Sequence, residues 1–138
     1  MFGCHTSTEK EKQIRKSFGP FAAAHHLNGL PDGHKCASVH GHNYQVTVTL
    51  ASDELTVPGF VTDFGDLAPF GAYVRHRMDH RDLNEVFDFE PTSELLANHL
   101  AEWFIANVEP AVPGRLLSVR VSESLSSWGE FVVQRDVA

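Results

Sequence analysis

The sequence has few cysteines and no long apolar run. Its 138 residues include two cysteines, Cys4 and Cys36, which are too few for a disulfide framework. No stretch approaches the roughly 18 consecutive apolar residues of a membrane span. The first ten residues lack the apolar core of a signal peptide, so we expect a cytoplasmic protein. In that reducing compartment Cys36 would be a free thiol.

Basic residues are also scarce. Lysine and arginine total 11 against 18 aspartates and glutamates, which gives a net charge of -7 at pH 7. That balance argues against a nucleic-acid-binding surface. A small polyanionic ligand needs only a local basic pocket, and Lys35, Arg75, Arg77 and Arg81 stand near the polar motifs below. Any one of them alone is better explained as a solvated surface charge.

The length suits one domain, which we expect over residues 14–138 after a flexible arm over residues 1–13. The alternation of Tyr44, Val46, Val48 and Leu50 with polar residues predicts a half-buried strand. Another strand is expected over residues 14–26, broken or bulged near Gly19-Pro20 because proline cannot donate to a ladder. Turn-forming residues predict a loop over 27–39.

The second half of the chain predicts two helices and two more strands. Asp63 is a candidate N-cap for a helix that reaches about Arg77, followed by a loop over 79–84. Residues 91–94 predict the start of a second helix, whose apolar stripe ends before Pro110. Leu117 opens an alternating strand that leads to residue 123, and a last strand is expected over 128–135. The order ββααββ predicts an α+β fold with a four-stranded antiparallel sheet and two helices on one face.

Several polar residues are not explained by this core pattern and fall at strand ends or in loops. If Gly41 lies in extended backbone, His40 and His42 project to the same side, although a lone His-Gly-His is most often a solvated turn. Three imidazoles with one open position are expected of catalytic zinc. The unexplained residues are His25, Cys36, His40, His42, Asp79, His80 and Glu123.

The same residues allow two interpretations. In the first, a cysteine beside a cation accepts a proton, an Asp-His pair relays it, and a glutamate accepts hydrogen bonds from a heterocycle. Such a site suits enolisation or carbon-carbon cleavage beside a carbonyl. In the second, Cys36 joins the three histidines in a closed structural zinc site without catalysis. That alternative leaves Asp79, His80 and Glu123 without a function, which mildly favours an enzyme.

Taken in order along the chain, these motifs carry a resemblance. They are Phe21 to His25, Gly33 to Cys36, His40-Gly41-His42, Thr62-Asp63-Phe64, Met78-Asp79-His80, Pro91 to Glu94 and Val121 to Ser124. The chain resembles the 6-pyruvoyltetrahydropterin synthase superfamily from about Phe18 to Phe131. Within it the chain looks most like the bacterial 6-carboxy-5,6,7,8-tetrahydropterin synthases of the queuosine pathway, because three residues separate Cys36 from His40.

The resemblance implies a tunnelling fold and a homohexamer built as a dimer of trimers, with active sites between subunits. It implies conversion of 7,8-dihydroneopterin triphosphate to 6-carboxytetrahydropterin with loss of acetaldehyde and triphosphate. A pyruvoyl-type product and a non-catalytic zinc module are the alternatives. The residue roles that it implies are zinc on His25, His40 and His42, proton transfer by Cys36 and by His80 with Asp79, pterin binding by Glu123, and substrate contacts by Thr92 and Lys35.

Overall fold

The computed structural model describes residues 10–135. The predicted arm over 1–13 is therefore described in part, and residues 1–9, including Cys4, lie outside the described residues. The first strand, β1 (Lys12–His25), begins two residues earlier than expected.

Four antiparallel strands form the main sheet, as predicted. They are β1, β2 (His40–Ser52), β4 (Arg115–Ser122) and β5 (Trp128–Val132), and the last of these ends before the expected residue 135. A fifth, two-residue strand, β3 (Arg81–Asp82), pairs in parallel with β1, so the order is β3-β1-β2-β4-β5. The prediction of a plain loop over 79–84 was wrong at this point.

The short strand β3 has a visible cause. The backbone N–H of His80 donates to the carbonyl oxygen of Ala22, and the Asp79 carboxylate accepts the N–H of Ala22. These two bonds align the following residues with the outer edge of β1. Because these hydrogen bonds join residues almost 60 positions apart, no local sequence pattern predicts them.

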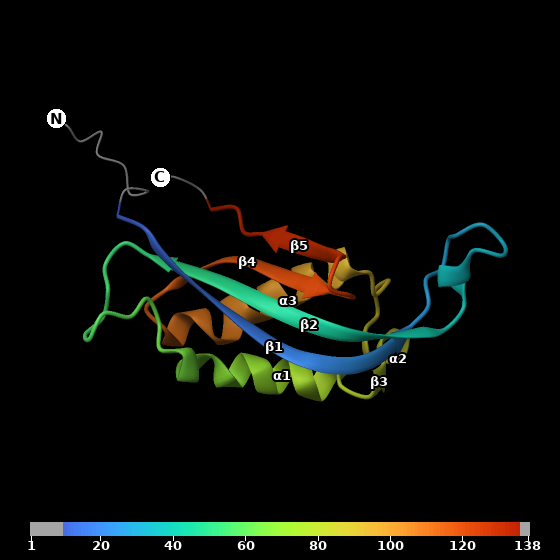
Figure 1. The fold of residues 1–138 in the computed structure, drawn as a ribbon, viewed down its shortest axis with the longest axis horizontal. Coiled ribbons are helices and arrows are strands. Elements are labelled where there is room, and N and C mark those ends of the chain that lie inside the picture. Colours follow the sequence, from blue (N-terminus) through green and yellow to red (C-terminus); the bar gives the residue numbers. More distant parts are fainter. Residues whose placement is uncertain (1–9, 136–138) are drawn as a thin grey trace.

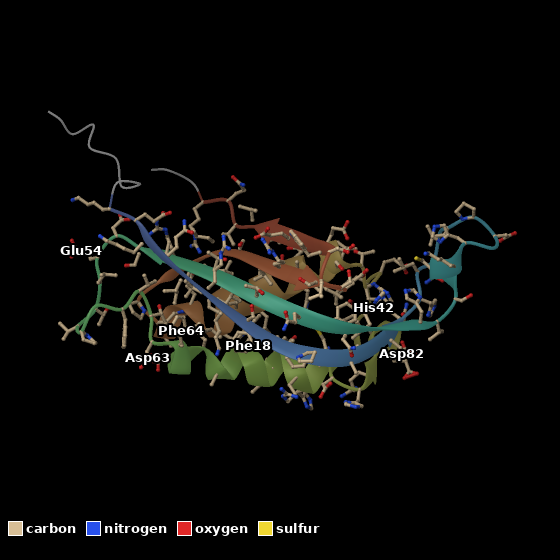
Figure 2. The ribbon with its side chains drawn as sticks, viewed as in Figure 1. Phe18, His42, Glu54, Asp63, Phe64 and Asp82 are labelled. Atoms are coloured by element: carbon tan, nitrogen blue, oxygen red, sulfur yellow. The ribbon has the colours of Figure 1, made fainter. Side chains whose placement is uncertain are left out.

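The helices pack on one face of the sheet (Figure 1). The long ones are α1 (Ala68–Met78) and α3 (Ser93–Asn107), and α2 (Leu83–Val86) is a single turn between them. Asp63 does act as an N-cap, but it caps a 3₁₀ turn, η3 (Phe64–Leu67), at the start of the helical layer (Figure 2). Pro69 stands in the first turn of α1. Shorter 3₁₀ turns are η2 (Lys35–Ala37) and η4 (Glu109–Ala111). Within residues 10–135, no helix combines the length and the apolar character needed to cross a membrane.

The core lies between the sheet and the helices. The predicted alternation in β2 is confirmed, since Tyr44, Val46, Val48 and Leu50 are all fully buried. The alternation predicted for β4 is wrong at its start: Leu116 is buried and Leu117 is half-buried. A shift in the pairing register between Thr49 and Leu50 of β2 causes this, because it inserts one residue opposite β2.

The predicted irregularity near Gly19-Pro20 is also confirmed. The pairing of β1 with β2 shifts between Phe18 and Phe21, and Gly19 has φ 124°. A Cβ atom at Gly19 would lie 2.7 Å from the Tyr44 carbonyl oxygen, so only glycine fits. After the shift, Phe21 and His25 face inward and are buried. The bulge therefore sets the direction of a histidine that the sequence singled out.

Candidate metal centre and adjoining pocket

Three histidines converge where β1 ends and β2 begins. His25 and His40 are register partners across the two strands, and His42 lies two residues further along β2. One ring nitrogen from each lies within 4.8 Å of the other two. The ring centroids are 4.6 to 5.1 Å apart. The strand therefore starts early enough to point both histidines of the His-Gly-His motif at His25, as predicted.

Hydrogen bonds orient two of these rings. The Nδ1 atom of His25 lies 2.7 Å from the carbonyl oxygen of Pro91, and the Nδ1 atom of His40 lies 2.7 Å from that of Ser38. A carbonyl oxygen can only accept, so Nδ1 carries the proton in each ring. The Nε2 atoms of His25 and His40 are then unprotonated and available as ligands, which is the usual second-shell arrangement of a metal-binding histidine.

The third ring fits the same function. The Nε2 atom of His42 is buried and has no hydrogen-bond partner within the described residues. Burial lowers the pKa of His42, and the neighbouring His25 and His40 lower it further, while Glu123 opposes them. The imidazole is therefore held in its neutral, metal-binding form. A buried nitrogen without a partner, beside two correctly oriented rings, fits a bound divalent cation.

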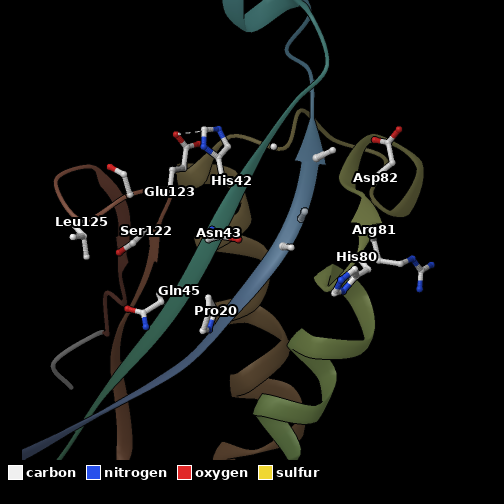
Figure 3. Close-up of a pocket in the computed structure, with 15 residues that line it drawn as sticks. Pro20, His42, Asn43, Gln45, His80, Arg81, Asp82, Ser122, Glu123 and Leu125 are labelled. Atoms are coloured by element: carbon white, nitrogen blue, oxygen red, sulfur yellow. Dashed lines mark ion pairs between the residues drawn. The ribbon is translucent and has the colours of Figure 1, made fainter.

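A pocket of about 950 Å³ opens beside the three histidines. Its volume is within the range of small-molecule sites. Figure 3 shows the Glu123 carboxylate facing the His42 ring, with Glu123 Oε1 at 3.9 Å from His42 Nε2. Glu123 follows the end of β4, and its side chain is 29% exposed, so its oxygens remain accessible to a ligand. The lining residues that no sequence motif includes are, among others, Asn43 and Gln45.

His80, which follows Asp79, lies across β1 from His42 (Figure 3). The Asp79 carboxylate is 3.2 Å from His80 Nδ1 and 3.3 Å from Arg75, and it also accepts the Ala22 N–H. Burial acts to raise the pKa of Asp79, but these hydrogen bonds and charges outweigh it and hold the pKa below its usual value. The carboxylate therefore stays ionised and orients the His80 ring.

His80 has an unusual backbone and an exposed side chain. Its φ of 59° is rare for a residue other than glycine, and its side chain is 83% exposed. His80 lines the pocket, as does Arg81. Both Arg81 and His42 are register partners of Ala23, so they stand two strand spacings apart, roughly 10 Å. Within one chain, His80 thus reaches the pocket from the far side of β1, away from the histidine cluster.

The predicted cysteine stands apart from the three histidines. Cys36 is a free, half-buried thiol in η2, and it does not belong to the described group of side chains whose donor atoms converge. The closed four-ligand site that the sequence left open is not what the structure assembles. Lys35 is exposed in the same turn and does not line the pocket.

The remaining predicted residue has a structural contact. The Thr92 hydroxyl accepts the N–H of Leu95 and caps α3, and Thr92 is not among the residues that line the pocket. The sequence pattern of β2 predicts Tyr44 as a core residue and gives it no further function. Its hydroxyl lies 3.3 Å from His25 Nδ1, and burial, with Glu123 nearby, raises its pKa. An aromatic residue two positions beyond a paired histidine was the signal that could have identified it.

Comparisons with known proteins agree on one family. Residues 13–133 match the family model described as 6-pyruvoyl tetrahydropterin synthase. A Synechocystis protein named 6-carboxy-5,6,7,8-tetrahydropterin synthase is 39% identical over 129 residues, which cover 88% of this chain and 94% of that protein. The solved 6-pyruvoyl tetrahydropterin synthase of Caenorhabditis elegans superposes with a TM-score of 0.76 at 26% identity, covering 90% of this chain and 96% of that one. A Wolinella succinogenes protein shares the fold with a TM-score of 0.78 at 22% identity, over 90% of this chain and 99% of that one.

Proposed function

The chain belongs to the 6-pyruvoyl tetrahydropterin synthase family, and we propose that it converts 7,8-dihydroneopterin triphosphate to 6-carboxy-5,6,7,8-tetrahydropterin, releasing acetaldehyde and triphosphate. Family membership confirms the predicted resemblance and the tunnelling fold. The observation that carries the proposal is the convergence of His25, His40 and His42 beside a pocket that Glu123 enters.

Two observations favour the carboxy product over the pyruvoyl product. The Synechocystis relative that covers most of the chain carries the carboxy name. The three-residue gap between Cys36 and His40 is also the spacing that resembles the carboxy enzymes. Both observations concern the product that the synthase releases, and the proposed site residues are the same for either product.

We assign zinc to the three histidines, because three neutral imidazoles are a typical catalytic zinc set. A zinc ion held there would supply Lewis-acid catalysis. The protein's own part is to orient the rings. The carbonyl oxygens of Pro91 and Ser38 do this for His25 and His40, and burial lowers the pKa of His42 and so favours its neutral form.

The remaining site residues bind the pterin and move protons. Glu123 presents an accessible carboxylate that can accept two hydrogen bonds from the amidine-like edge of a pterin. Cys36 accepts a proton from the substrate side chain. His80 returns a proton to the opposite side, held in position by the ionised Asp79. Lys35 and Thr92 remain our candidates for further substrate contacts.

We further propose that the active unit is a cytoplasmic homohexamer that serves queuosine biosynthesis and binds neither nucleic acid nor membranes. The position of Asp79 and His80 supports a site shared between subunits. Arg81, the next residue along the chain, stands roughly 10 Å from His42 within one chain, so we infer that the pair acts on the histidine cluster of a neighbouring chain.

Product analysis tests the proposal. The purified protein, loaded with zinc, is incubated with 7,8-dihydroneopterin triphosphate, and the pterin products and acetaldehyde are measured by chromatography. We expect 6-carboxytetrahydropterin and acetaldehyde in equal amounts. Pyruvoyltetrahydropterin without acetaldehyde would assign the chain to the pyruvoyl subtype instead. Absence of turnover would favour the non-catalytic module.

A substitution of the cysteine provides a second test. A Cys36→Ala variant should keep its zinc, because the thiol lies outside the histidine cluster, and should lose turnover by about 100-fold or more. Full turnover in this variant would remove Cys36 from the mechanism.

A further inference from the structure

We propose that Glu90 is a positioning residue that, through Asn28, fixes the loop carrying Cys36 in relation to the three histidines. This inference rests on the function proposed for Cys36. The loop joins β1 to β2 and projects beyond the end of the sheet, where α2 and the segment after it approach its base (Figure 1). Glu90 belongs to that segment, between α2 and α3.

Glu90 holds Asn28 with both carboxylate oxygens. Its Oε1 accepts the backbone N–H of Asn28 at 2.7 Å, and its Oε2 accepts the Asn28 side-chain amide at 3.0 Å. The two residues are 62 positions apart in the chain. The arrangement is bidentate, so it fixes orientation as well as distance. The same hydrogen bonds lower the pKa of Glu90 and keep the carboxylate ionised.

The residue before Asn28 connects this contact to the cysteine. The N–H of Leu27 donates to the carbonyl oxygen of Cys36 at 2.9 Å. Cys36 is held locally as well, since its N–H donates to the Nδ1 atom of His34 at 3.0 Å. The backbone of Cys36 is thus two hydrogen-bonded steps from the Glu90 carboxylate.

The rest of the loop has few other attachments. Within the described residues, the hydrogen bonds of residues 29–37 run to one another, to Leu27 or to Ser38. The far end of the loop is tied at Ser38, whose carbonyl oxygen lies 2.7 Å from His40 Nδ1. Most of its residues are exposed, so burial contributes little to its position. Apart from the Asn84 contact with His26 at the end of β1, the contact between Glu90 and Asn28 is the connection among the described residues that joins the first half of the loop to the helical layer.

The helix α2 and the segment that carries Glu90 also hold the end of β1 and the residue that follows it. The Asn84 side chain accepts the His26 N–H at 2.8 Å and donates to the His26 carbonyl oxygen at 3.0 Å. The carbonyl oxygen of Pro91, next to Glu90, lies 2.7 Å from the ring of His25. Residues 84–91 thus contact both the first histidine of the cluster and the base of the cysteine loop. Loss of the Glu90 side-chain contact alone would release the loop that carries the thiol, while the contacts of Pro91 and Asn84 keep the end of β1 in place.

A Glu90→Gln variant tests the proposal on the full-length protein. The new side-chain amide keeps one acceptor oxygen, but its NH₂ group faces an N–H donor of Asn28. One of the two hydrogen bonds is therefore lost. We expect hydrogen exchange of the Leu27 amide, followed by NMR, to accelerate about tenfold, the equivalent of losing one charge-assisted hydrogen bond. Exchange in the paired core of β2 and β4 should not change. Turnover should fall at least tenfold in kcat with little change in KM, and zinc affinity should be unaltered.

Two further variants separate positioning from a general loss of structure. Glu85→Gln removes an exposed α2 carboxylate that makes no hydrogen bond within the described residues, and it should behave as wild type. Adding Asn28→Asp to Glu90→Gln exchanges the acceptor and donor side chains, because the new carboxylate can accept from the new amide. We expect this double variant to recover slow Leu27 exchange and most of kcat.

The outcomes are decisive in either direction. Unchanged Leu27 exchange in Glu90→Gln would show that the contact does not hold the loop. Accelerated exchange with an unchanged kcat would show that the contact does not position Cys36 for the reaction. A failure of the double variant to recover kcat together with slow exchange would also overturn the proposal. If the wild-type protein turns over no dihydroneopterin triphosphate, the proposed function fails, and the exchange measurements still decide whether Glu90 holds the loop.

Discussion

The carbonyl oxygen of Pro91 lies 2.7 Å from the Nδ1 atom of His25, and this contact joins the start of the α3 segment to the end of β1. The contact spans 66 positions of the chain and involves a histidine that is 1% exposed. A backbone acceptor cannot change its protonation state, so it fixes one tautomer of the ring. The ligand nitrogen of His25 is therefore set by the fold.

Removing one ring of the cluster should abolish tight metal binding. We expect His42→Ala to lower zinc affinity more than about 100-fold, which is the upper range for losing an outer-shell partner. Wild-type protein should gain about 2.7 kcal/mol of unfolding free energy at a zinc concentration 100 times the dissociation constant. The variant should gain almost none at that concentration. Chelator competition and thermal unfolding with and without zinc measure the two effects.

A second histidine serves as the control. His76 is exposed on α1 and lies outside the cluster, so His76→Ala should retain the affinity and the zinc-dependent shift of wild type. Equal zinc responses in wild type and His42→Ala would contradict the assignment of His42 as a ligand.

The buried hydroxyl of Tyr44 should tune the metal site modestly. Tyr44→Phe keeps the ring, which packs 5.4 Å from the His42 ring, and removes the hydroxyl 3.3 Å from His25 Nδ1. His25 keeps its shorter bond to Pro91, so no partner is left unsatisfied. We expect a loss of about 1 kcal/mol in unfolding free energy and a decrease of up to about tenfold in zinc affinity. The control is Tyr73→Phe. It removes a hydroxyl that contacts His99 instead of His25, so it should leave zinc affinity unchanged.

Much of this site could be predicted from sequence because its ligands follow local rules. The alternation in β2 fixed the side to which His40 and His42 point, and the Gly19-Pro20 irregularity placed His25 on the buried side. The contacts of Pro91 with His25 and of Glu90 with Asn28 could not be predicted. They join loop residues more than 60 positions apart, and neither contact belongs to a periodic pattern.

If Asp79 and His80 act in the reaction as proposed, turnover should depend on the charge of Asp79. Asp79→Asn keeps the shape but can orient the His80 ring in the wrong tautomer, so we expect kcat to fall by about 100-fold or more with a small change in KM. Steady-state kinetics with dihydroneopterin triphosphate measure this loss. Asp66→Asn, which changes an exposed aspartate of η3, is the control and should keep wild-type kinetics.

Asp79 also makes a prediction for acid stability. Its pKa in the folded protein is lower than the ordinary 3.8 of the unfolded chain, so the unfolded state binds the proton first. The stabilisation is complete above pH 3.8 and is lost as the pH falls through the lower, folded value. Urea unfolding between pH 5 and pH 3 should show that the free energy of unfolding of the wild type decreases relative to that of Asp79→Asn. A constant difference across this range would contradict the lowered pKa.

A second pH dependence should come from His99, far from the metal site. Its ring packs among Tyr73, Phe87 and Phe89, and its Nε2 lies 2.8 Å from the Tyr73 hydroxyl. Burial lowers the pKa of His99, and Arg77 lowers it further, against opposing effects of nearby carboxylates. The unfolded chain therefore takes up a proton near pH 6.5 before the folded protein does.

The direction in which stability changes with pH follows from this order of protonation. Because the unfolded state binds more protons below pH 6.5, the contribution of His99 to stability is complete above that pH and is lost as the pH falls through the lower, folded pKa. His99→Gln can still hydrogen-bond the Tyr73 hydroxyl but cannot titrate. In chelator, where no metal is bound, urea unfolding from pH 7.5 to pH 5 should give a shallower pH dependence for His99→Gln than for wild type. Since His42 titrates in both proteins, the difference between the two curves isolates His99, and parallel curves would show that its burial does not matter to stability.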